Sequence, residues 1–221
     1  EEKQVFLPFI GYLLSKENER ELAPVYLISF LTQKMLLMAI YERWNEVKVS
    51  DAAKRIGVST KSASRCFDEL AYLNIDVLGM KGKSRVINIP NDRKQVWQQI
   101  ENVLRNPVIR RFVLREDMKL EKKAGISALC EYSLLSDNVY PIYAVTKKEL
   151  KDSGVKAEKQ VSELEEIGCV VLELGYFIDF LGKGFQDPLS VVLSLTGDEQ
   201  EEERVDISIN EMLEEYVWSK D

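Results

Sequence analysis

The chain has 221 residues, of which 45% are hydrophobic and 30% are charged, and its formal net charge is −7. This amount of apolar material can offset the entropy lost on ordering, so the composition excludes a protein that is mainly disordered. The sequence contains no histidine, which excludes a histidine general base, a histidine-activated nucleophile and a histidine metal ligand.

The three cysteines, Cys66, Cys130 and Cys169, are far apart and form no CxxC pair. Such isolated thiols are typical of a reducing cytoplasm, and their spacing does not predict a zinc site. No signal peptide opens the chain, and the most apolar stretch, residues 25–41, is too short and too polar to span a bilayer. We therefore expect a cytoplasmic protein without a membrane partner.

The first half of the chain predicts an apolar lead-in followed by helices. Residues 5–14 are apolar and are expected to pack on the next domain or to form a dimer seam. A helical run follows at 33–44, with Thr32 as its N-cap. A second, short helix is expected to begin with Ser50 as its cap and to end at Gly57, because glycine readily adopts the left-handed conformation of a helix C-terminus.

A third helix is predicted at 60–73, with Ser59 as its N-cap. Its apolar residues follow the spacing of one buried face, whereas its other face is polar and cationic near the N-terminus. A recognition helix reads base edges with its N-terminal residues, so this face predicts DNA binding; a plain solvated helix face is the alternative. The candidate DNA-contacting residues of this helix are Ser59, Thr60, Lys61, Ser62, Ser64 and Arg65.

Two apolar β-type runs come next, at 74–78 and 85–90, separated by a loop rich in glycine and lysine. A hairpin directly after a recognition helix is typical of the wing of a winged helix. Its cations, Lys81, Lys83 and Arg85, are expected to contact the DNA backbone.

The distribution of charge agrees with a nucleic-acid-binding segment. Residues 45–115 carry 14 basic and 7 acidic side chains, a net charge of +7, whereas residues 116–221 have a net charge of −13. A basic module fused to an acidic second domain would produce this asymmetry, and so would chance solvation of helix faces.

The stretch at 52–59, together with Ser64-Arg65 and Glu69-Leu70, resembles the winged helix of MarR-type transcriptional regulators. This resemblance covers about a third of the chain. It implies a homodimer whose paired recognition helices read double-stranded DNA, with residues 60–65 as the base-reading positions and 81–85 as the wing. The chain departs from the family pattern because a second domain of about 100 residues follows the winged helix.

The second half alternates between predicted helices and strands. Arginines crowd the segment 105–115, which is either a linker or an extension of the phosphate-facing surface. The predicted elements beyond it are helices at 125–132, 146–152, 157–167, 188–193 and 202–218 and strands at 140–145 and 169–174.

We therefore predict an α+β protein, in which a winged helix-turn-helix domain is followed by a mixed α/β C-terminal domain. The predicted organisation is a lead-in at 1–29, a DNA-binding domain at 30–95, a helix and Arg-rich linker at 96–122 and an acidic α+β domain at 123–221.

Three short segments of the acidic domain, at 124–129, 143–145 and 187–190, are similar to a family of bacterial proteins whose second domain resembles AbiE-type antitoxins. The similarity implies an autoregulating antitoxin, with a toxin as protein partner. Antitoxins of that type usually begin with the winged helix, whereas at least thirty residues precede it here.

The sequence indicates no catalytic residue, metal ligand or cofactor. Gly182-Lys183-Gly184 lacks the full phosphate-loop spacing, and a solvated surface explains the acidic run at 198–203 better than a metal site does. The expected function is therefore sequence-specific DNA binding for transcriptional control, without enzymatic activity. The alternative is a protein-interaction module in which the winged helix and the acidic domain bind a protein partner and no DNA.

Overall fold

The computed structural model describes residues 27–136, 138–155, 161 and 166–219, together with the backbone of strands β1 (Val5–Leu7) and β2 (Tyr12–Leu14). The two strands pair with each other in antiparallel register. The packing expected of the apolar lead-in depends on side chains outside the described residues, and so does most of the helix predicted at 157–167.

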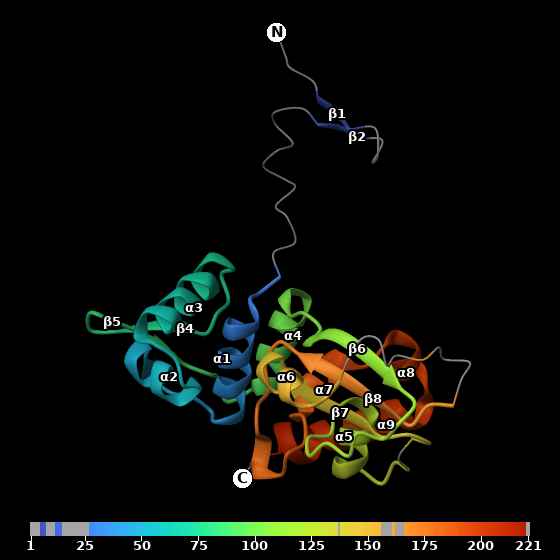
Figure 1. Cartoon of the computed structure of the whole chain (residues 1–221). Coiled ribbons are helices and arrows are strands. Elements are labelled where there is room, and N and C mark those ends of the chain that lie inside the picture. The colour runs from blue at the N-terminus through green and yellow to red at the C-terminus, as the bar shows by residue number, and fades with distance from the viewer. Residues whose placement is uncertain are drawn as a thin grey trace.

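The first half of the described chain combines helices with a small antiparallel sheet (Figure 1). The sheet has the strand order β3-β5-β4. The elements are α1 (Phe30–Tyr41), β3 (Val47–Lys48), α2 (Val49–Ile56), α3 (Thr60–Tyr72), β4 (Leu78–Lys81), β5 (Ser84–Ile87), α4 (Arg93–Ile100) and the 3-10 turn η2 (Glu101–Val103).

Local capping chemistry explains most of these helix ends. Ser59 caps α3 as predicted, and Gly57 ends α2 in the left-handed conformation at φ 72°. Two caps were predicted wrongly. Ser29, rather than Thr32, caps α1, and α2 begins at Val49 without a side-chain cap, so Ser50 lies inside the helix.

The hairpin is shifted in sequence relative to the prediction. Asn74, at φ 53°, ends α3 in the left-handed region that asparagine tolerates, so the first strand does not begin at 74. The turn consists of Gly82 and Lys83, and residues 79–81 belong to β4 instead of to the loop. In Figure 1 this hairpin projects beyond the helices that precede it.

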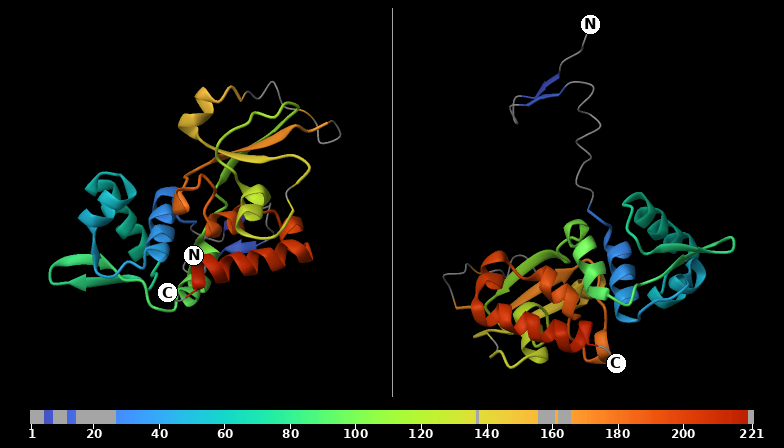
Figure 2. Two further views of the ribbon diagram at one scale, coloured as in Figure 1. Left: turned by 90° about the horizontal axis from the view of Figure 1, so that it is seen from below. Right: turned by 180° about the vertical axis from the view of Figure 1, so that it is seen from behind.

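The second half contains a mixed sheet with the order β6-β8-β7, in which β8 pairs antiparallel with β6 and parallel with β7. One face of the sheet packs on α5, α7 and α9, and the other packs near α6 (Figure 2). The elements are β6 (Val108–Leu114), α5 (Gly125–Tyr132), β7 (Ile142–Thr146), α6 (Lys147–Asp152), β8 (Cys169–Leu174), the turn η4 (Phe180–Gly182), α7 (Pro188–Ser194), α8 (Gly197–Glu201), α9 (Glu203–Leu213) and the π-helical turn η5 (Glu214–Trp218).

Strand β6 occupies part of the segment that the sequence assigned to an Arg-rich linker. Its exposed beginning carries Arg110 and Arg111, which obscure the strand pattern, whereas its last three residues are buried. The Arg110 guanidinium pairs with Glu173 of β8, whose side chain is only 2% exposed. These arginines are therefore part of a sheet in an overall α+β fold.

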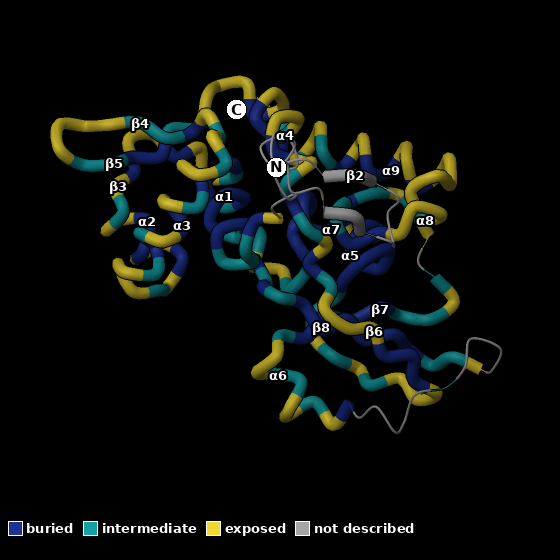
Figure 3. Tube along the Cα trace, turned by 90° about the horizontal axis from the view of Figure 1, so that it is seen from above, coloured by how far each residue is buried: buried dark blue, intermediate teal, exposed yellow. Residues whose placement is uncertain are grey.

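Helix α1 contributes to a core that both halves share. Most of its residues are buried, and they form one hydrophobic cluster with α2, α3 and the small sheet (Figure 3). The same cluster contains residues that are distant in sequence: Tyr176, Ile178, Leu189 and Val217. No helix in the described ranges is long and apolar enough to cross a membrane.

Candidate nucleic-acid interface

The N-terminal half of α3 presents a polar, cationic surface. Ser59 Oγ accepts a 3.1 Å hydrogen bond from the Ser62 amide, which fixes the start of the helix. Thr60, Lys61 and Arg65 are exposed. The opposite face is buried against α1 and α2 and consists of Ala63, Cys66, Phe67 and Leu70.

Lys61 and Arg65 are four residues apart, so they lie on the same face of α3. Within the part of the chain that the structure describes, neither side chain makes a hydrogen bond or an ion pair. Their charges therefore face solvent and are available to a ligand.

The three cations of the hairpin have different surroundings. Lys81 forms an ion pair with Glu46, which lies between α1 and β3. Lys83 lies in the exposed turn and has no ion-pair partner among the described residues. Of the hairpin lysines, Lys83 is thus the one with an uncompensated charge.

Arg85 contacts α3 instead of pointing away from it. Its guanidinium forms a 2.5 Å ion pair with Asp68 and donates a 2.9 Å hydrogen bond to Ser64 Oγ. It also lies over the Phe67 ring, 5.7 Å from the ring centroid. Arg85 therefore attaches the hairpin to α3, a role that sequence reasoning missed because the partners are 17 and 21 residues away.

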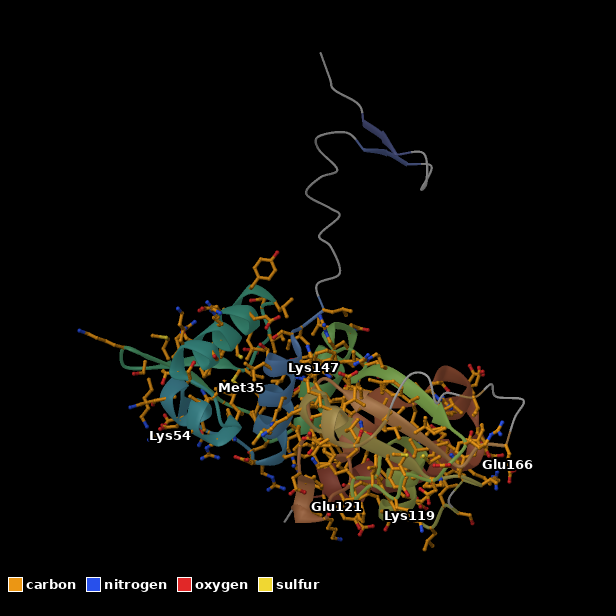
Figure 4. The ribbon with its side chains drawn as sticks, in the orientation of Figure 1. Met35, Lys54, Lys119, Glu121, Lys147 and Glu166 are labelled. Atoms are coloured by element: carbon orange, nitrogen blue, oxygen red, sulfur yellow. The ribbon has the colours of Figure 1, made fainter. Side chains whose placement is uncertain are left out.

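Helix α2 adds two cations that the sequence analysis did not include. Lys54 is exposed on the outer side of α2 (Figure 4). Arg55 is paired with Glu42 at 2.6 Å and lies 5.4 Å from the centroid of the Trp44 ring. Both residues lie in the last turn of α2, where cations are stabilised by the helix dipole. This position is the local feature by which the sequence could have indicated them.

The acidic run Asp198–Glu203 does not cover this surface. Helix α8, which carries most of the run, lies at the end of the molecule opposite α3 and the hairpin (Figures 1 and 3). The acidic run therefore leaves the cationic surface of α3 uncovered.

A buried polar network joins α1 to the second half of the chain. Asp187 caps α7 through the Ser190 amide, and its Oδ1 atom accepts a 2.5 Å hydrogen bond from the Tyr41 hydroxyl. The other carboxyl oxygen is buried and has no hydrogen-bond partner among the residues that the structure describes. Burial raises the pKa of Asp187 to about 6, and it raises the pKa of Tyr41 well above its ordinary value.

The network continues from α7 to the other end of α1. Ser190 Oγ lies 2.8 Å from the Tyr176 hydroxyl, which accepts a 2.9 Å hydrogen bond from the Gln33 side chain. Gln33 in turn donates to the Arg105 carbonyl oxygen. These contacts bind α1 to the second half by polar as well as apolar interactions.

Within the described ranges, no group of three or more cysteine, aspartate or glutamate side chains could hold a metal ion. No protein-family model, no curated protein and no solved structure matches this chain. The features that indicate a function are therefore those of the chain's own surface.

Proposed function

We propose that the chain is a DNA-binding transcriptional regulator without enzymatic activity, in which residues 30–95 form a winged helix-turn-helix. In this proposal α3 enters the major groove and the β4–β5 hairpin is the wing that contacts the backbone. The single observation that carries the proposal is that Lys61, Arg65 and Lys83 are exposed with no compensating partner in the described part of the chain.

Helix geometry supports this assignment. The α3 N-terminus carries the positive end of the helix dipole, which favours nearby phosphate groups. Thr60 and Lys61 occupy its first turn, and Arg65 follows one turn later on the same side as Lys61. The major groove admits an α-helix, and an arginine there can bind guanine through two hydrogen bonds.

The contacts within the protein narrow the set of DNA-contacting residues. Ser59 and Ser62 are engaged in the helix cap, and Ser64 accepts from Arg85. We therefore assign direct contacts to Thr60, Lys61, Arg65 and Lys83, and we assign Arg85 the role of positioning the wing. A wing that is already attached to α3 loses less conformational entropy on binding.

The experiment is a salt titration of binding to random-sequence duplex DNA, followed by fluorescence anisotropy. We expect affinity to fall steeply with salt, because cations that contact phosphate release counterions. The variant Lys83→Ala should reduce the salt slope by about one unit. Lys147→Ala, which removes an exposed lysine of α6, is the matched control and should leave the slope unchanged. Absence of binding at low salt would contradict the proposal.

A second function, docking of a protein partner, is favoured by two apolar side chains in the loop between α5 and β7. Leu134 and Val139 are fully exposed, and a protein partner would bury their apolar area. A toxin partner, as the similarity to AbiE-type antitoxins implies, is compatible with DNA binding by the other half. A docking module alone predicts no binding in the DNA titration.

A further inference from the structure

An open groove of about 420 Å³ lies between α1 and the segment that follows β8. Its volume is within the range of sites that bind small molecules. Helix α1 contributes Lys34, Met38 and Tyr41, and the opposite wall contains Phe177 and Phe180. The DNA-contacting residues proposed above lie outside it, so the groove requires a separate explanation.

Besides Lys34, three charged residues line the groove. Arg55 and Glu42 form an ion pair with each other at 2.6 Å. Asp179 is exposed to solvent, and its Oδ1 atom accepts a 3.4 Å hydrogen bond from the Gly184 amide. The Arg55–Glu42 pair is neutral overall, whereas Asp179 keeps its negative charge, which the surrounding water screens because the side chain is exposed.

Lys34 is different because its ammonium is partly buried and makes no hydrogen bond or ion pair with any residue that the structure describes. Burial lowers the pKa of Lys34, and the electrostatic attraction of the Asp187 carboxylate opposes that shift. Removing a charge from water without giving it a partner costs free energy, which an anion placed next to Lys34 would recover.

The remaining lining is aromatic and aliphatic. The Tyr41 and Phe180 rings lie 4.6 Å apart between centroids, at 41° to each other. The Tyr41 hydroxyl is held by Asp187 and by the Leu189 amide, so this ring is fixed in place. A flat apolar molecule can pack against such rings and bury area that is otherwise hydrated.

We propose that this groove binds a small organic anion with a flat apolar body, whose acidic group pairs with Lys34 and whose rings pack against Phe180. The ligand contacts both α1 and the segment 177–181, so its binding stabilises the junction between the two halves. This proposal does not depend on DNA binding.

Two fluorescent dyes of nearly equal shape test the proposal on the full chain. Anilinonaphthalene sulfonate carries an anionic group, whereas phenylnaphthylamine has the same rings without it. We expect the anionic dye to bind saturably to one site per chain. The variant Lys34→Met should weaken the anionic dye about tenfold or more and the neutral dye less than about twofold, because the lost interaction is electrostatic.

Companion variants separate this site from general surface adsorption. Phe180→Ala should weaken both dyes, Lys34→Arg should retain binding of the anionic dye, and the exposed-site control Lys54→Met should change neither. Thermal unfolding followed by circular dichroism verifies that each variant is folded. Non-saturable dye binding, or an equal effect of Lys34→Met on both dyes, would overturn the proposal; should that variant not fold, the same comparison is made with Lys34→Gln.

Discussion

The Tyr41 hydroxyl donates a 2.5 Å hydrogen bond to the buried Asp187 carboxylate, across 146 residues of sequence. This contact joins the C-terminal end of α1 to the N-terminus of α7. The same hydroxyl accepts a 2.8 Å hydrogen bond from the Leu189 amide, so it connects the carboxylate to the first turn of the helix.

Tyr41→Phe should destabilise the protein. The substitution leaves Asp187 Oδ1 without its tyrosine donor and the Leu189 amide without an acceptor, at a cost of about 1–3 kcal/mol in the free energy of unfolding. Urea unfolding near neutral pH measures the change. Tyr140→Phe is the control, because the hydroxyl of this half-buried tyrosine makes no hydrogen bond in the described part of the chain. Equal effects of the two substitutions would contradict the assigned role.

The stability difference between the wild type and Asp187→Asn should depend on pH. Burial raises the pKa of Asp187 from 3.8 to about 6, so between these values the folded state binds more protons than the unfolded state. The wild type should therefore lose stability relative to the variant as pH rises from about 4 to about 6, by at most about 3 kcal/mol. Below and above this window the difference should be constant.

Urea unfolding of both proteins at several pH values provides the measurement. The slope of the stability difference against pH is the diagnostic quantity. Its absolute value is not, because the asparagine substitution also alters the cap of α7, which changes the stability by an amount independent of pH. A stability difference that does not change across this pH range would show that burial does not raise the pKa of Asp187.

Arg65→Ala should weaken binding to a selected duplex by about 1–3 kcal/mol and relax sequence preference. The side chain lies on the exposed face of α3 and has no competing partner in the described residues. Competition between the selected duplex and random-sequence DNA measures the preference directly. If specific and non-specific affinities fell equally, Arg65 would contact phosphate instead of bases.

Arg85→Ala should lower affinity for DNA but change the salt slope less than Lys83→Ala does. The Arg85 guanidinium is engaged by Asp68 and Ser64, so its removal loosens the hairpin and does not remove a phosphate contact. The slope of log affinity against log salt separates the two roles. A slope change equal to that of Lys83→Ala would place Arg85 on the DNA.

Gly175→Ala should destabilise the junction between α1 and β8. A Cβ atom at this position would lie 2.5 Å from Cδ2 of Phe30, at the start of α1, so the ring must move. Overpacking of this kind costs about 1–3 kcal/mol. Gly197→Ala is the matched control, because its Cβ atom would meet nothing within 4 Å. Chemical unfolding of the two variants should show a large loss of stability for Gly175→Ala and none for Gly197→Ala.

Features set by local chemistry could be predicted from the sequence. Ser59, Thr146 and Asp187 cap the helices that follow them, as their side chains predict, and Gly57 supplies the expected left-handed end. The exposed face of α3 follows from helical spacing alone. The use of that face in DNA binding is still a prediction.

Features set by distant contacts were not predictable in the same way. Strand β6 was missed because its arginines hide the strand pattern, and the pairing of Arg110 with Glu173 brings together residues 63 positions apart. The groove beside Lys34 combines residues from 34–55 with residues from 177–181. No periodicity indicates such pairings, since they arise only when the two halves pack together.

The core that α1 shares with the second half limits how the chain can be divided. Tyr176, Ile178, Leu189 and Val217 pack in the same cluster as this helix. A recombinant fragment restricted to residues 30–95 would leave that side of the helix in water and lose the acceptor of the Tyr41 hydroxyl. Residues 30–95 are thus not a portable module for fusion proteins, and truncation mapping would report misfolding instead of identifying the region that we propose to bind DNA.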